Sequence, residues 1–206
     1  MTVISEKSPK DCASKKASKK LYLYLTTLLL SLLSVIFIIW LILHPSKPHF
    51  SLREADINQL NLSLRPSLLN SSIQITLQSH NPNTKLGIYY DEFLLYASYK
   101  GQKITPETSL PPFYQDRHET NLLSASLVGI QLPVSPSFAY EAQRDQGAGR
   151  LALSIKGMGQ LRWKVGTLVS GRYRFIVNCV AIMPLGPTIP SPPLSSRQTS
   201  QCSTSM

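Results

Sequence analysis

The chain has 206 residues, 43% of them hydrophobic, and a formal net charge of +10 at pH 7. That length allows one domain of ordinary size together with a tail or an anchor. The basic residues are not interleaved with aromatic residues on one face, which argues against a nucleic-acid-binding protein.

Residues 1–20 are polar and rich in lysine, with a net charge of +4. We expect a disordered cytosolic tail that is attracted to anionic lipid. Cys12 lies in this segment and is a candidate for reversible palmitoylation, with a free thiol as the alternative. The remaining charge of +6 belongs to residues 44–206, whose mildly basic surface would suit an acidic wall, glycan or lipid.

An uncharged segment from Leu21 to Leu43 contains neither proline nor glycine. As a helix it would be about 34 Å long, enough to cross a hydrocarbon core of about 30 Å. A buried core helix and a cleaved signal peptide are the alternatives, but Leu43-His44-Pro45 offers no small-x-small cleavage site. The segment therefore predicts one transmembrane helix.

The flanks of this segment predict its orientation. Lysines gather before it, including Lys15, Lys16, Lys19 and Lys20, and positive charge stays on the cytosolic side of a membrane. Residues 44–206 should therefore lie in the lumen or outside the cell. The glycosylation sequons at Asn61 and Asn70 fit that side. Cys179 and Cys202 would also lie on the oxidising side, where a disulfide could form between them.

After the helix, residues 44–49 form a predicted stalk in which Pro45 and Pro48 stop a helix from continuing. Hydrophobic and polar residues then alternate through residues 50–183, as they do at Ile73, Ile75 and Leu77. Short alternating strands separated by turns predict an all-β fold, an antiparallel sandwich of the immunoglobulin or fibronectin type III kind.

Three details complete this pattern. Residues 136–145 are the one stretch of the domain that favours a helix. Gly157 and Gly159 indicate a bend or bulge between two strands. Residues 184–206 are rich in proline and serine and predict a loosely ordered tail.

The chain offers no recognisable catalytic, metal-binding or cofactor motif. The four histidines lack metal-ligand spacing, the cysteines form no CxxC pair, and there is no nucleophile elbow. Asp91 and Glu92 are adjacent, so on a regular strand they would point to opposite faces and could not flank one bond. We expect a protein that is not an enzyme. Tyr89 and Tyr90 then serve strand pairing or, alternatively, a partner-binding surface.

Three short motifs follow one another in residues 80–115, and we call their residues the signature. They are Asn81, Pro82 and Asn83, then Tyr89, Tyr90 and Asp91, then Pro111, Pro112, Phe113, Tyr114 and Gln115. In order and spacing the signature resembles that of the plant harpin-induced, non-race-specific disease-resistance-like proteins, the NHL family. The resemblance implies a plasma-membrane protein with a late-embryogenesis-abundant type 2 domain, a role in pathogen defence, hypersensitive cell death and stress responses, and no catalytic residues.

We therefore expect a single-pass membrane protein, with its β domain extracellular, that binds a protein or cell-wall partner. An endoplasmic-reticulum address and a homo-oligomer remain open. One alternative is a membrane-proximal lipid-binding module, with an internal cavity lined by residues such as Leu77, Phe93 and Phe175. Another is a hydrolase that depends on Asp91 or Glu92.

Overall fold

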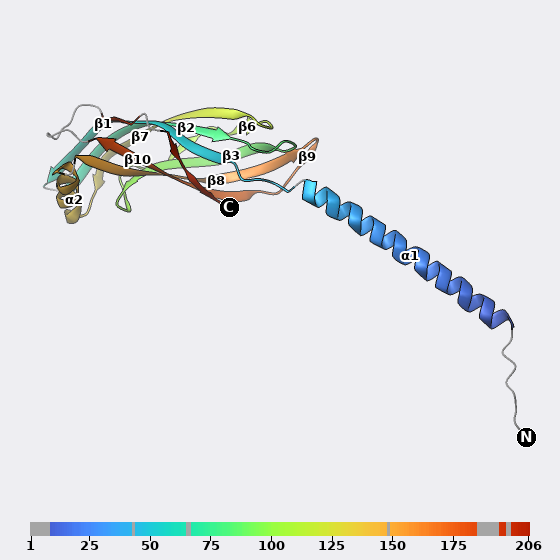
Figure 1. The fold of residues 1–206 in the computed structure, drawn as a ribbon. Coiled ribbons are helices and arrows are strands. Elements are labelled where there is room, and N and C mark those ends of the chain that lie inside the picture. Colours follow the sequence, from blue (N-terminus) through green and yellow to red (C-terminus); the bar gives the residue numbers. More distant parts are fainter. Residues whose placement is uncertain (1–8, 43, 65–66, 148, 185–193, 197–198) are drawn as a thin grey trace, which may run out of the picture. The chain divides into compact units, whose positions relative to one another are not determined.

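The computed structural model describes residues 9–42, 44–64, 67–147, 149–184, 194–196 and 199–206. The chain divides into two units, Met1–His44 and Pro45–Met206 (Figure 1). The first contains the helix α1 and the second contains the β-strands.

Helix α1 extends over Pro9–Ile42. Residues 9–20 are therefore helical, which corrects the prediction of a disordered tail there, while Leu43 lies outside the described residues. Within α1, Lys19–Ile38 is long and apolar enough to cross a membrane, with a mean hydropathy of 2.3. Its hydroxyl groups donate to carbonyl oxygens three residues earlier, for example Thr26 to Leu23 and Ser31 to Leu28. These bonds satisfy the polar side chains without water, so the helix is compatible with a membrane anchor.

The β unit contains two antiparallel sheets. The first has the order β11-β1-β2-β7, with β12 also paired to β1; these strands are β1 (His49–Leu64), β2 (Ser67–His80), β7 (Thr120–Pro133), β11 (Leu194–Ser196) and β12 (Ser200–Gln201). The second has the order β13-β10-β8-β3-β4; its long strands are β3 (Gly87–Tyr99), β8 (Arg150–Val165) and β10 (Tyr173–Pro184). Its short strands are β4 (Gln102–Lys103), β5 (Thr108–Leu110), β6 (Phe113–Gln115), β9 (Leu168–Val169) and β13 (Ser203–Ser205).

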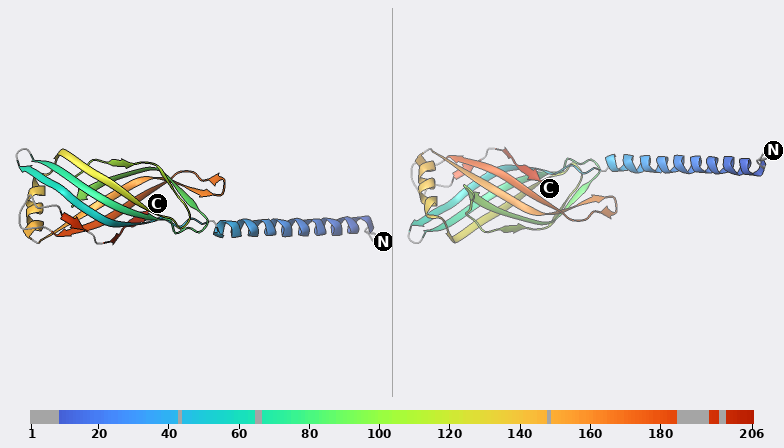
Figure 2. Two further views of the ribbon diagram at one scale, coloured as in Figure 1. Left: turned by 90° about the horizontal axis from the view of Figure 1, so that it is seen from above. Right: turned by 90° about the horizontal axis from the view of Figure 1, so that it is seen from below.

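The two sheets face each other around one core, which confirms the predicted antiparallel sandwich (Figure 2). Strand β2 alternates as its sequence predicts, with Ile73, Ile75 and Leu77 buried. Helix α2 (Pro136–Gly147) covers one end of the sandwich, close to the predicted 136–145, and its Phe138 ring packs edge-on against Tyr99.

Strand β8 runs without a break through Gly157 and Gly159, so the predicted bend between two strands is wrong. The irregularity lies on its neighbour β3, where the register shifts between Tyr90 and Glu92. A Cβ at position 159 would lie 2.0 Å from the Glu92 carbonyl oxygen. Glycine is therefore needed where the bulge brings the two backbones together.

The C-terminal segment is ordered where it is described, which corrects the prediction of a loosely ordered tail. Strands β11 and β12 pair with β1 in the first sheet, and β13 pairs with β10 in the second. Between β12 and β13, Cys202 forms a disulfide with Cys179 of β10. Residues 185–193 and 197–198 lie outside the described residues. The tail thus joins an edge of each sheet.

Candidate functional site

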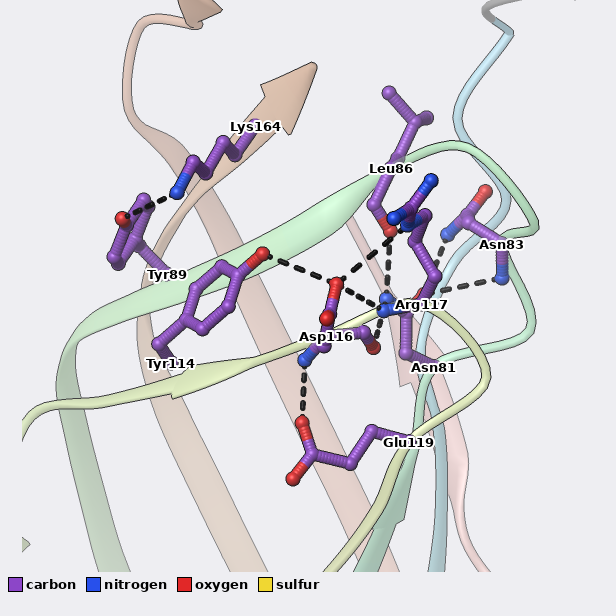
Figure 3. A network of polar contacts seen from close by, with 9 residues as sticks. All are labelled: Asn81, Asn83, Leu86, Tyr89, Tyr114, Asp116, Arg117, Glu119 and Lys164. Atoms are coloured by element: carbon purple, nitrogen blue, oxygen red, sulfur yellow. Dashed lines mark hydrogen bonds and ion pairs between the residues drawn. The ribbon is translucent and has the colours of Figure 1, made fainter. Parts of the chain in front are cut away.

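The turn Asn81-Pro82-Asn83 connects β2 to β3, and its two asparagine side chains are buried (Figure 3). Asn81 Nδ2 donates to the carbonyl oxygens of Leu86, at 2.8 Å, and Asp116, at 2.9 Å. Asn81 Oδ1 accepts the backbone N–H and the side-chain N–H of Asn83, at 3.1 and 2.9 Å. The turn is therefore fixed to itself and to the β6–β7 loop.

The same turn holds the chain where it enters the β unit. The Ser46 N–H donates to Asn83 Oδ1, and Asn83 Nδ2 donates back to the Ser46 carbonyl, both at 2.8 Å. Pro48 is buried. The second half of the predicted stalk is therefore part of the folded unit, because two hydrogen bonds attach it to the Asn81-Pro82-Asn83 turn.

Strand pairing brings the two halves of the signature together. Strand β6 lies antiparallel to the start of β3, with Tyr89 opposite Tyr114 and Tyr90 opposite Phe113. The Tyr89 and Tyr114 rings are 4.6 Å apart, centre to centre. A Cβ at Gly87 would lie 2.3 Å from the Tyr114 hydroxyl, so a side chain there would displace this tyrosine. Pro111 and Pro112 lie exposed between β5 and β6.

Tyr90 is buried on the inner face, where its hydroxyl group lies 3.2 Å from both Ser79 Oγ and Gln115 Oε1. Burial raises the pKa of Tyr90 above its usual range. Gln115 Nε2 also donates to the Ser79 carbonyl at 2.9 Å. Both residues therefore satisfy buried polar groups and link the two sheets, which is a structural role.

A hollow of about 350 Å³ opens beside the signature. Its lining residues are Lys85, Gly87, Tyr114, Asp116, Arg117, Lys164 and Gly166. Lys164 Nζ donates to the Tyr89 hydroxyl at 3.2 Å and lies 5.0 Å from the centre of the Tyr114 ring (Figure 3). That hydrogen bond raises the pKa of Lys164, and the Arg117 backbone N–H lowers the pKa of Asp116. The groups are therefore charged at neutral pH.

Asp91 and Glu92 both lie on the outer side of β3, which corrects the prediction that they face apart. Tyr90 and Phe93 are both buried, so the bulge leaves the two acids between them on the solvent side. Arg162 Nη2 and Nε donate to the Asp91 carboxylate at 2.6 and 2.8 Å. These bonds lower the pKa of Asp91, which makes it a poor proton donor at neutral pH.

The other candidate residues lie away from this hollow. Asn61 and Asn70 are opposite each other in the β1–β2 pair, and Asn70 Oδ1 accepts the Gln131 N–H at 2.7 Å. Cys12 lies in α1. No group of three or more potential metal-ligating side chains occurs among the residues that the structure describes.

The space required for a lipid tail is filled by core side chains. Leu77, Phe93 and Phe175 are at most 1% exposed. The Phe93 ring packs edge-on against Phe175 with 5.1 Å between centres, and Phe50 stacks on Phe175 at 5.9 Å. Among the described residues, these side chains therefore fill the interior between the sheets, where the lipid-tail alternative required a cavity.

Sequence reasoning did not identify Lys85, Arg117 or Lys164. They come from three separate segments, the β2–β3 loop, the β6–β7 loop and the end of β8. Each is an unremarkable basic residue in its local sequence. Their common hollow depends on the pairing of β3 with both β6 and β8, which no local pattern encodes.

The chain is thus a β-sandwich unit preceded by an exposed apolar helix. Residues 76–180 match the family described as late embryogenesis abundant protein. The chain is 52% identical to the Arabidopsis thaliana NDR1/HIN1-like protein 26, over all of both chains. It is 38% identical to NDR1/HIN1-like protein 1 of the same plant, over 86% of this chain and 88% of that one. It belongs to the NDR1/HIN1-like family with a late-embryogenesis-abundant type 2 domain.

A solution structure of another Arabidopsis thaliana protein is 16% identical. It covers 68% of this chain and 83% of its own, with a TM-score of 0.34.

Proposed function

We propose that the protein is a single-pass plasma-membrane protein of plant defence and stress response, and not an enzyme. Its N-terminus would be cytosolic and its β-sandwich extracellular. The sandwich would act by binding a protein or a cell-wall component during defence signalling that leads to the hypersensitive response.

One observation carries this proposal: the exposed apolar span Lys19–Ile38 precedes a packed β-sandwich of the NDR1/HIN1-like family. The carboxylate of Asp91 is bound by Arg162 and so is unsuited to acid catalysis. An anchored, well-packed domain is suited to presenting a surface, because anchoring raises its effective concentration for partners at the membrane.

Proximity labelling from the β unit tests the proposed function. A labelling enzyme fused after Met206 of the full-length chain should mark wall and plasma-membrane proteins, with a different set after pathogen challenge. The control is residues 1–48 joined to an unrelated secreted domain that carries the same enzyme. Identical labelling by the two fusions, before and after challenge, would contradict an interaction role of the sandwich.

A further inference from the structure

Three cations converge on the hollow beside the signature. Lys85, Arg117 and Lys164 line it together with a single carboxylate, that of Asp116. The lining therefore carries a net charge of +2, since the remaining lining residues are glycines and Tyr114. Lysine and arginine around one hollow are the usual partners of phosphate and carboxylate groups.

The cations keep donors available for a ligand. The Arg117 side chain is 60% exposed, and its contact with Asp116 is a long one of 3.6 Å. Lys164 has three N–H donors, of which one goes to the Tyr89 hydroxyl. Lys85 is exposed on the β2–β3 loop. An anion in the hollow could thus accept hydrogen bonds from several sides.

An exposed apolar hairpin tip lies beside these cations. In the β8–β9 pair Val169 is opposite Lys164 and Leu168 is opposite Val165. Leu168 is 75% exposed and Val169 is 45% exposed. Apolar side chains next to lysine and arginine are typical of segments that enter the interfacial layer of a bilayer.

The chain also enters the β unit at this end. Asn83, two residues before Lys85, holds Ser46 by the two hydrogen bonds described above. Ser46 is only four positions after Ile42, the end of α1, so the chain between them spans at most about 14 Å. With α1 in a bilayer, as proposed above, chain length alone keeps the hollow near the phospholipid headgroups.

We propose that Lys85, Arg117 and Lys164 bind headgroup phosphates of the bilayer that holds α1, while Leu168 and Val169 enter the headgroup layer. This inference rests on the proposed membrane anchoring. Docking would orient the sandwich so that the other end of β8, next to α2, points away from the membrane. A partner would then meet that end.

Quenching in nanodiscs tests the docking with the full-length chain. An environment-sensitive dye is placed at Thr167→Cys, between Gly166 and Leu168, in a Cys12→Ser background that retains the Cys179–Cys202 disulfide. Nitroxide groups on phospholipid headgroups should quench this dye. The same dye at Tyr140→Cys in α2 should not be quenched, because the 16 residues of β8 extend over about 50 Å.

The decisive variant is Lys85→Gln with Arg117→Gln and Lys164→Gln. Each lost cation should lower the ratio of docked to undocked protein about fivefold. The matched control neutralises three basic residues away from the hollow, Arg144→Gln, Arg150→Gln and Lys156→Gln, and should quench as the unaltered protein does. Bilayers of an uncharged galactolipid, with the nitroxide groups carried on the sugar headgroups, offer no phosphate and should also abolish quenching.

Equal quenching in the triple glutamine variant of the hollow and in its control would overturn the proposal, and so would equal quenching in galactolipid and phospholipid bilayers. The proposal would also be overturned if soluble oligogalacturonate, but not inorganic phosphate, protected Lys85 and Lys164 from chemical modification. The site would then be assigned to an acidic glycan. Co-elution of the protein with the nanodisc is recorded in every case. If co-elution itself fails, the membrane anchoring is wrong, and that result is distinct from the loss of docking alone.

Discussion

Asparagine suits positions 81 and 83 because its side chain both donates and accepts hydrogen bonds. Asn81 uses both capacities: its nitrogen binds the Leu86 and Asp116 carbonyls, and its oxygen binds Asn83. Aspartate would lack the donors, and a hydrophobic residue would leave buried carbonyl groups without partners. The signature asparagines are therefore explained by the closure of one end of the sandwich.

Replacing Asn81 by alanine should lower the free energy of unfolding of the β unit by about 3 kcal/mol, since a 0%-exposed hydrogen-bonding group is lost. Urea unfolding of the full-length protein in detergent measures the change. Asn178→Ala is the control, because Asn178 lies on the exposed face of β10 and should change stability by less than about 0.5 kcal/mol. A loss at position 81 no greater than at 178 would contradict the role of the turn.

Asp91 should make stability depend on acid pH. Its folded pKa lies below the ordinary value of 3.8, because Arg162 binds the charged form. The contribution is therefore complete above about pH 5 and is lost as the pH falls through the folded pKa. Unfolding followed between pH 2 and 6 should show a shallower acid slope for Asp91→Asn, and also for Arg162→Gln. The same acid slope in the unaltered protein and both variants would refute this coupling.

Local pattern predicted some elements and failed on others for identifiable reasons. Strand β2 alternates strictly and is flanked by turn residues, so its buried face could be predicted from Ile73, Ile75 and Leu77. Gly157 and Gly159 indicated a bend or bulge between two strands, yet they lie inside β8. Glycine is needed there because the backbone and side chains of the neighbouring strand β3 come too close for a side chain. A requirement set by another strand is invisible in a local window.

The C-terminal strands were missed for a similar reason. Serine-rich residues such as Ser203–Ser205 have little strand preference of their own, and here they form a strand because β10 offers an open edge. The disulfide to Cys179 then holds them in place. Sequence showed that this disulfide could form, but only the strand pairing shows which edges it joins.

Breaking that disulfide should release the tail. The two cysteines are 23 residues apart, and closing a loop of that size stabilises the folded chain by about 3 kcal/mol. Cys179→Ala with Cys202→Ala should therefore lower stability by about that amount and speed amide hydrogen exchange in residues 200–205. Cys12→Ala is the control and should change neither. Unchanged exchange in the tail of the double variant would show that strand pairing alone holds it.

At the scale of the whole molecule, the apolar span and the β unit were predictable, whereas the basic hollow was not. Hydropathy is a property of consecutive residues and therefore locates Lys19–Ile38 directly. The hollow combines Lys85, Arg117 and Lys164, which become neighbours only through the strand order of the second sheet. Composition indicated a basic surface but could not place it.

Charges introduced into the span should prevent membrane integration. Leu29→Arg together with Leu33→Arg should cost about 6 kcal/mol for insertion, by the usual penalty for arginine near the middle of a helix. Alkaline carbonate extraction should then release the protein from microsomes, while Leu29→Ile with Leu33→Ile should remain bound. Retention of the arginine variant would contradict anchoring by α1.

Glycan attachment tests which side of the membrane carries the sandwich. Asn61 and Asn70 lie within the β unit, so microsomal synthesis should add glycan to that unit and protect it from external protease. Replacing both asparagines by glutamine should abolish the mass shift while leaving protease protection intact. Digestion of the β unit in sealed vesicles would reverse the proposed orientation.

The two hydrogen bonds between Ser46 and Asn83 also determine where a mechanical force on the chain enters the sandwich. A pull on the chain from its N-terminal side would enter the sandwich at Ser46 and pass directly into β1, the strand that follows it. The hydrogen bonds from β1 to β2 lie across that direction, so they are loaded in shear and must fail together. The backbone of Cys202 adds one more hydrogen bond to β1, because its N–H donates to the Phe50 carbonyl at 3.0 Å. The geometry suits a domain that keeps its shape under tension.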